Sequence, residues 1–243
     1  MAGSSRKRDD DLERFEGFAG IDFFRELKKR QSREWFAKHK TEYEAGFAKP
    51  MAALLREAAR ALERSYPDCE LDQPKVFRIH RDVRFSRDKS PYKTHIAGVI
   101  AVRSGGSKLT ATPAALYLHL GIDAMSNAEQ RETGAGLYSM EPEQLVRYRR
   151  AALDPKKGAE LRRMLKKLEA SGARFIAADS LKRPPPGVPV DHPLAELLKL
   201  KGLAAMFPKL PAALTGRRGL LDRVVEQGKL AAPLVRWLAY EAR

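Results

Sequence analysis

Three stretches in the middle of the chain combine β-branched and aromatic residues with the two-residue period that is typical of β-strands. They span residues 76–86, 92–103 and 114–122. The links between them are short and rich in turn-forming residues, whereas parallel neighbours would need a crossover of about a dozen residues or more. The pattern therefore predicts an antiparallel meander, which a further short strand at residues 134–138 extends.

Apolar residues at helical spacing dominate both sides of this central region. Helices are expected at residues 20–30, from Ser32 to Pro50, from Pro50 to Tyr66, from Pro142, from Asp154, at residues 191–201 and at residues 234–240. Ser32 and Asp154 can cap helix N-termini, and Pro50 cannot donate the hydrogen bond that would continue the preceding helix. The order of elements predicts an α+β fold, with a central antiparallel β-sheet meander flanked by N-terminal and C-terminal helices.

Residues 15–243 are expected to form a single α+β domain, because no internal repeat and no long linker divides them. Residues 1–14 are rich in charged side chains and are expected to form a flexible charged tail. The hydrophobic content of 43% and charged content of 32% are typical of a folded globular chain.

The composition also limits where such a chain is expected to work. No apolar run follows the basic residues near the amino terminus, so a secretory signal is not expected. No segment approaches the roughly 18 uninterrupted apolar residues of a spanning helix, so no membrane partner is expected. The single cysteine, Cys69, excludes an internal disulfide and a multi-cysteine zinc cluster, which fits a cytoplasmic protein.

Residues 75–95 concentrate charge in a segment that also reads as β-structure, with seven Lys or Arg, two Asp and two His. Side chains at alternate positions of a strand share a face and lie about 6.7 Å apart. If the three central strands pair in phase, one face of the sheet is apolar and packs on helices, while the other is polar. The polar face would then collect Arg78, His80, Asp82, Arg84, Lys93, His95, Tyr117 and His119.

A face with several cations, several imidazoles and few carboxylates is suited to binding an anion. Arg offers paired donors to phosphate or carboxylate groups, and His exchanges protons near neutral pH. We therefore predict a small anionic ligand as the partner, with no cofactor. The predicted ligand-binding residues are Arg78, Arg81, Arg84, Lys89, Tyr92 and Lys93. The catalytic candidates are His95, His119 and Asp82.

Arg81 departs from the alternation, which would place it on the apolar face. Either a β-bulge near residues 80–82 re-aims it, or the strand ends at His80 and a charged loop follows. Zinc ligation by His80, His95 and His119 together with Asp82 is chemically permissible. These residues lie on separate strands without a recognised ligand spacing, so no metal site is predicted.

Two other functions are compatible with the same segment. A nucleic-acid-binding module would use the basic turn together with Phe85 and Tyr92. The formal net charge of +15 would attract polyanions, but ordinary surface residues explain most of this excess, so nucleic acid is expected to bind only weakly. Alternatively, a non-catalytic structural protein would use ion pairs such as Arg81–Asp82 or Arg84–Asp88 to hold a loop. The sequence leaves the oligomeric state open.

The order of residues from position 78 to position 92 is distinctive, and reads Arg78-x-x-Arg81-Asp82-x-Arg84-Phe85-x-x-Asp88-Lys89-x-x-Tyr92. It resembles the signature of a bacterial and fungal family of conserved hypothetical proteins, catalogued as domain of unknown function 2461. Further similar stretches are Arg33-Glu34-Trp35-Phe36, Lys93-Thr94-His95 and Tyr117-Leu118-His119-Leu120. The resemblance covers roughly residues 15–240, and it implies a location for the site but no established activity.

Overall fold

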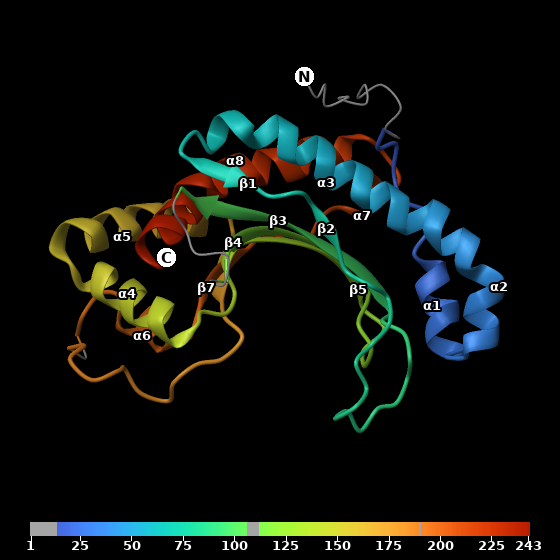
Figure 1. Ribbon diagram of the computed structural model, residues 1–243, viewed down its shortest axis with the longest axis horizontal. Coiled ribbons are helices and arrows are strands. Elements are labelled where there is room, and N and C mark those ends of the chain that lie inside the picture. Colours follow the sequence, from blue (N-terminus) through green and yellow to red (C-terminus); the bar gives the residue numbers. More distant parts are fainter. Residues whose placement is uncertain (1–13, 106–111, 190) are drawn as a thin grey trace, which may run out of the picture.

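A bowed antiparallel sheet runs through the centre of the molecule, and two long helices, α3 (Lys49–Leu62) and α8 (Gly219–Glu241), cover its convex face (Figure 1). The computed structural model describes residues 14–105, 112–189 and 191–243. The tail expected at residues 1–14 therefore lies, apart from its last residue, outside the described part of the chain. The predicted α+β fold with an antiparallel sheet and helices on both sequence sides is confirmed.

The strands of the sheet follow the order β1-β3-β4-β5-β7-β6, with β2 beside β3, and every pairing between them is antiparallel. Their bounds are β1 (Cys69–Leu71), β2 (Lys75–Val76), β3 (His95–Ser104), β4 (Ala114–Ile122), β5 (Glu129–Leu137), β6 (Arg174–Ile176) and β7 (Leu203–Met206). Strands β3, β4 and β5 pair in sequence order, so the predicted meander forms the middle of the sheet.

The remaining helices are α1 (Asp22–Lys29), α2 (Arg33–Tyr43), α4 (Pro142–Leu153), α5 (Pro155–Ala170), α6 (Ala195–Lys199) and α7 (Ala212–Thr215), with a π-helix, η2 (Glu44–Ala48), and a short 3₁₀-helix, η3 (Glu63–Ser65). The expected caps are present: Ser32 Oγ accepts the Trp35 N–H at 3.1 Å, and the Asp154 carboxylate accepts two N–H groups of α5. None of the helices in the described part of the chain is long and apolar enough to cross a membrane.

The expected third helix is present as α3, with Pro50 in its first turn. The prediction that Pro50 ends the second helix is wrong, because α2, η2 and α3 follow one another without interruption. Pro50 has no N–H to donate to the Gly46 carbonyl one turn earlier. That carbonyl instead accepts the Ala19 N–H at 3.0 Å, while the Lys49 N–H reaches back to the Glu44 carbonyl. The π-helical turn therefore accommodates Pro50 within a continuous helix. The free Gly46 carbonyl connects the segment before α1 to this helix through its hydrogen bond with Ala19.

Other boundaries were harder to predict because the local pattern is not informative there. Strands β1, β6 and β7 were not predicted; β7 is buried at every position, so it shows no alternation. Strand β5 begins before residue 134, and α8 begins at Gly219 rather than at residue 234. The expected helix at residues 191–201 is reduced to α6. Glycine and proline inside α8, at positions 228 and 233, lower its helix propensity, but packing overrides this preference.

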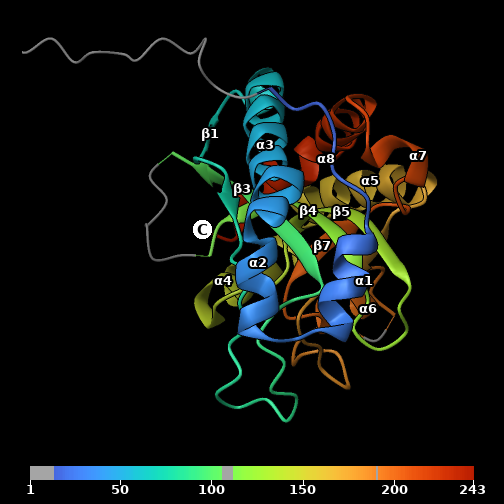
Figure 2. The same cartoon turned by 90° about the vertical axis from the view of Figure 1, so that its right-hand side faces the viewer.

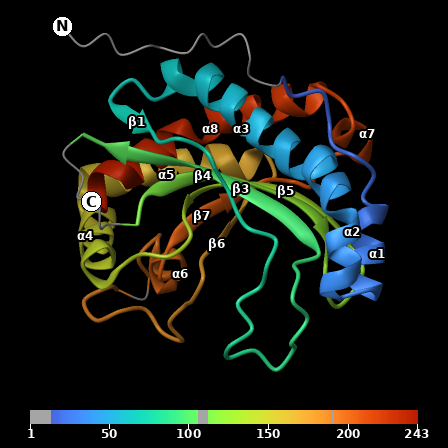
Figure 3. The same ribbon diagram turned by 45° about the vertical axis from the view of Figure 1, so that its right-hand side comes forward.

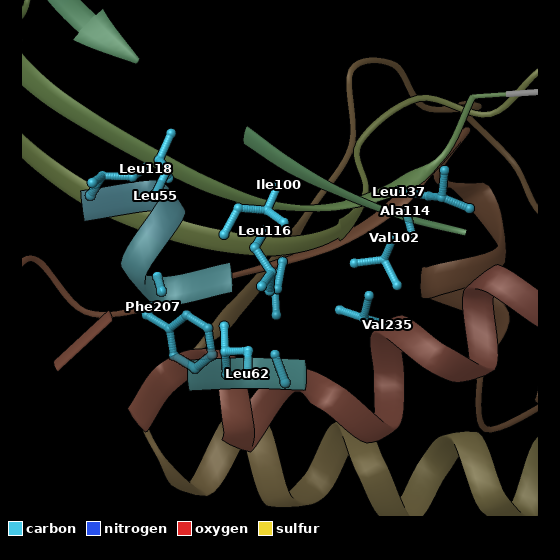
Figure 4. Packing of buried hydrophobic residues seen from close by; sticks show 14 of the residues in the cluster. Leu55, Leu62, Ile100, Val102, Ala114, Leu116, Leu118, Leu137, Phe207 and Val235 are labelled. Atoms are coloured by element: carbon cyan, nitrogen blue, oxygen red, sulfur yellow. The ribbon is translucent and has the colours of Figure 1, made fainter. Parts of the chain in front are cut away.

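The apolar face of the meander packs directly on α3 and α8. Figure 4 shows the side chains of β3 and β4, among them Ile100, Leu116 and Leu118, pointing toward Leu55 and Leu62 of α3. The helices can approach closely because small residues face them. A Cβ at Gly98 would lie 2.5 Å from Leu55 Cδ1, and one at Gly228 would lie 2.7 Å from Leu62 Cδ1. The helix-facing side of the sheet is thus fully enclosed, and the opposite side carries the polar residues of β3 and β4.

We expect Leu62→Ala to destabilise the protein by about 2–5 kcal/mol, because Leu62 is 0% exposed and its removal leaves a cavity between α3 and α8. Val146→Ala is the matched control, since Val146 is 65% exposed and loses no packed neighbours. Urea unfolding measures both free energies. Equal effects of the two changes would contradict the packing described above.

Candidate functional site

The segment after β2 runs beside the start of β3 as an irregular ribbon and then leaves the sheet. Ladder-like hydrogen bonds join Phe77 N–H to Ala97 O, Lys93 N–H to Ile79 O and Arg81 N–H to Pro91 O, at 2.8, 2.8 and 2.9 Å. Residues 82–90 then form a loop, which we call the 82–90 loop. The strand predicted over residues 76–86 is therefore too long, and of the two alternatives for Arg81, the charged loop after His80 is correct.

A β-bulge is also present, but it lies on the other side of the ribbon from the predicted position. Val76 pairs with Gly98 and His80 pairs with Tyr92, so residues 77–79 face residues 93–97, and the β3 side carries two extra residues. The bulge turns Thr94 inward, where its hydroxyl donates to the Ile122 carbonyl at 2.8 Å. Bulges re-aim side chains next to functional sites, and this one determines the direction of Lys93 and His95.

The charged groups of the 82–90 loop are largely satisfied within the loop. Arg81 pairs with Asp88, and Arg84 makes a two-pronged contact with Asp82 at 3.0 and 2.7 Å. The partners are thus exchanged relative to the Arg81–Asp82 and Arg84–Asp88 pairs considered from the sequence. Lys89 Nζ donates to the Val83 carbonyl at 3.0 Å, closing the loop.

These contacts also set the protonation of both loop carboxylates. Hydrogen bonds from Ser90, followed by those from Arg81, hold the pKa of the Asp88 carboxyl well below its usual value. Hydrogen bonding by Arg84 likewise lowers the pKa of Asp82. Both groups are therefore ionised at neutral pH and act as fixed partners of the two arginines.

An open cleft of about 500 Å³ lies between the base of the 82–90 loop, the end of α1, the start of β3 and the turn after β4. Its lining consists of Lys28, Gln31, Arg81, Asp88, Ser90, Tyr92, Lys93, Thr94, His95, His119, Ile122, Asp123, Ala124 and Gln130. Gln31 joins the helices to this wall, because its side-chain amide both accepts the Tyr92 N–H at 3.0 Å and donates to the Tyr92 carbonyl at 3.3 Å. We call this hollow the cleft.

Two imidazoles form the inner wall of the cleft. The rings of His95 and His119 stack with their centroids 4.2 Å apart, and the Tyr117 hydroxyl lies 2.8 Å from His119 Nδ1. Burial, with the neighbouring His119 and Lys93 adding to it, lowers the pKa of His95 from 6.5 to about 3. Burial also lowers the pKa of His119. Both rings are therefore neutral at pH 7.

Lys93 is the cation closest in sequence to this pair, and it is half-buried in the same wall. Burial, with the charge of Arg78 adding to it, lowers the pKa of the Lys93 ammonium. The centroid of the Phe77 ring lies 5.9 Å from its Nζ. Across the described ranges, no carboxylate forms an ion pair with Lys93, so its charge is available to a ligand.

The predicted site residues divide into two groups. Those that line the cleft are Arg81, Tyr92, Lys93, His95 and His119. Those that lie outside it are Arg78, Asp82, Arg84 and Lys89. Tyr92 contributes mainly to the wall, since its side chain is 4% exposed and stacks on Phe36. His80 packs on the rings of Phe36 and Tyr92 and does not join the His95–His119 pair.

Sequence reasoning missed the part of the cleft that comes from α1, from the connection between α1 and α2, from the turn after β4 and from the start of β5. Lys28, Gln31, Asp123 and Gln130 reach the cleft from these distant segments, and no local pattern marks them. Among the residues that the structure describes, no three His, Cys, Asp or Glu side chains come together in a way that could hold a metal ion.

The fold and the cleft together define an α+β protein with a cationic, histidine-walled cleft at one end of its central meander. A family model described as "Conserved hypothetical protein (DUF2461)" matches residues 19–237, and the chain belongs to this family. The resemblance seen in the sequence is thereby confirmed at the level of the family. Comparison with curated proteins finds no match, and comparison with solved structures finds none either.

Acid should destabilise the native protein through His95. Because its pKa is lowered from 6.5 to about 3, the unfolded chain binds a proton in this pH window that the native state does not bind. The contribution to stability is complete above the unfolded pKa and is lost as the pH falls toward the folded one, by up to about 1.4 kcal/mol per pH unit. Urea unfolding of His95→Gln should therefore show a smaller loss over this window than the wild type. Identical pH profiles would contradict the burial of a neutral His95.

Proposed function

We propose that the protein binds a small anionic ligand, bearing a phosphate or carboxylate group, in the cleft. The observation that carries this proposal is Lys93, a half-buried ammonium without a carboxylate partner in the described part of the chain. Keeping such a charge partly desolvated is costly, and an anion offsets this cost by supplying the opposite charge. The size of the cleft suits a small molecule.

The other charged groups of the cleft support this assignment because they are already engaged. Arg81 and Asp88 neutralise each other at the mouth of the cleft. The Asp123 carboxylate accepts the N–H groups of Met125 and Ser126 at 2.9 and 2.7 Å, and so it stabilises its own turn. The Lys28 ammonium donates to the Asn127 side-chain oxygen at 2.6 Å. Lys93 is therefore the charged residue of the cleft lining for which the described part of the chain shows neither an ion pair nor a hydrogen bond from its ammonium.

The stacked imidazoles give the cleft the groups that proton transfer requires. The negative charge of a ligand held by Lys93 would raise the lowered pKa values of His95 and His119, so the neutral rings could then accept a proton from it. Tyr117 orients His119 through its Nδ1. Asp82 is better assigned to orienting Arg84, since these two residues contact each other on the exposed loop. Arg78, Arg84 and Lys89 then contribute to the positive field around the cleft. We place this activity in the cytoplasm, where the free thiol of Cys69 would stay reduced.

Phosphate or pyrophosphate should stabilise the native protein. A ligand that binds only the native state adds about 2.7 kcal/mol at a hundredfold excess over its Kd. For a chain of this size, each kcal/mol raises the thermal midpoint by roughly 2–4 °C. Lys93→Gln should abolish the shift, because it removes the charge that faces the ligand. Differential scanning calorimetry at matched ionic strength measures this effect.

Lys229→Gln is the matched control, since it removes one exposed lysine from α8, on the other face of the sheet. It should retain the full shift. Chloride should produce no shift, because screening does not supply directed contacts. If phosphate, pyrophosphate and carboxylate anions all behave like chloride, the proposal fails and the charged pairs of the 82–90 loop are better understood as structural.

A further inference from the structure

Phe85 presents an almost bare aromatic ring to solvent, with 98% of its surface exposed. It belongs to the 82–90 loop, which extends away from the sheet on the side opposite α3 and α8 (Figures 2 and 3). An aromatic ring exposed to this degree contributes nothing to the core, and it forgoes the free energy that burial would provide. We infer that the 82–90 loop is a stacking platform that binds single-stranded nucleic acid through Phe85.

Contacts within the 82–90 loop define its conformation in the absence of a partner. The Arg81–Asp88 pair spans Phe85 in the sequence, and the Arg84–Asp82 pair lies directly before it. The Lys89 ammonium donates to the Val83 carbonyl and closes the turn at 3.0 Å. A platform that is ordered beforehand loses less conformational entropy on binding, so stacking on it yields more net affinity.

Arg84, Arg87 and Lys89 place positive charge close to the ring. The Arg84 guanidinium lies 6.0 Å from the centroid of the Phe85 ring, within reach of a base stacked there. Arg87 and Lys89 are exposed on the same loop, and Arg87 has no ion pair with any described carboxylate. Single-stranded nucleic acids are recognised by this combination of aromatic faces and backbone-contacting cations. The formal charge of +15 adds a long-range attraction to any such strand.

The chemistry of the loop favours a nucleic-acid strand over an anionic membrane. Phe85 is the one fully exposed large apolar side chain of the loop, and its neighbours Asp82, Ser86 and Asp88 are polar. A single ring is sufficient to stack on a base, whereas stable membrane attachment needs more apolar surface or a second anchor. A paired duplex keeps its bases stacked internally, so the ring has access to them only in a single strand.

This inference is independent of the proposed function. Phe85 is not among the residues that line the cleft, and its ring packs on no part of the core. Substitutions of Phe85 should therefore leave the phosphate-induced shift unchanged, and Lys93→Gln should leave stacking on Phe85 unchanged. The failure of one proposal can be distinguished from the failure of the other.

Fluorescence anisotropy with a labelled oligothymidylate tests the platform. The wild type should bind with micromolar affinity at low salt, and Phe85→Ala should weaken binding at least fivefold, since one stacked base contributes about 1–3 kcal/mol. Phe85→Leu keeps an apolar side chain without a π-face and should lose as much affinity as Phe85→Ala. Phe85→Trp should retain or increase the affinity. All three variants should melt at the wild-type temperature, because the ring has no packing partners in the core.

Met125→Ala is the matched control, because Met125 is 92% exposed on a different loop and carries no aromatic ring. It should bind like the wild type. Arg87→Gln should reduce the slope of log K against log salt by about 0.7, the contribution of one phosphate contact. Unchanged binding by Phe85→Ala, or full binding by Phe85→Leu, would overturn the proposal. So would Phe85-dependent binding to phosphatidylserine vesicles in the absence of oligonucleotide binding.

Discussion

The packing of α3 and α8 against one face of the meander is the interaction on which the rest of the structure depends. It buries Ile100, Leu116 and Leu118 against Leu55 and Leu62, and it requires glycine at the points of closest approach (Figure 4). Once this face is enclosed, strand alternation directs every second residue of β3 and β4 to the opposite side. The same alternation directs the imidazoles of the cleft toward the open side of the sheet and the neighbouring leucines toward the helices.

The cleft depends on two local irregularities that connect this core to the surface. The bulge on the β3 side turns Thr94 into the protein and leaves Lys93 and His95 facing outward. The paired hydrogen bonds between Gln31 and Tyr92 then fasten the connection between α1 and α2 to the same strand end. Both contacts satisfy backbone groups that the end of a regular ladder would leave unpaired. The same contacts therefore stabilise the fold and define the wall of the cleft.

Charge pairing separates the basic segment into two surfaces with different properties. Asp82 and Asp88 engage Arg84 and Arg81 within the 82–90 loop, in which the Phe85 side chain remains exposed. Burial lowers the pKa of His95 and also that of Lys93. The Lys93 ammonium has no carboxylate partner in the described residues. We propose a small anion as the ligand of the Lys93 surface and a single nucleic-acid strand as the ligand of the loop surface. Two kinds of contact can thus arise from one run of basic residues.

Much of the architecture follows from the sequence alone. Periodicity and turn chemistry predict the α+β class, the central antiparallel meander, the caps at Ser32 and Asp154, and the apolar phase of β3 and β4. These features can be predicted because they depend on residues close in sequence and on the burial of apolar side chains away from water. The segment from residue 75 to residue 95 is also identified as the chemically distinctive one. The contacts within this segment and around it do not follow from the sequence. The exchange of partners between Arg81 and Arg84, the bulge opposite residues 77–79, and the arrival of Lys28 and Gln31 in the cleft were decided only by the tertiary structure. These contacts join residues that are distant in sequence or that depend on a shift of register, and such pairings are selected by the packing of the whole chain rather than by any local pattern.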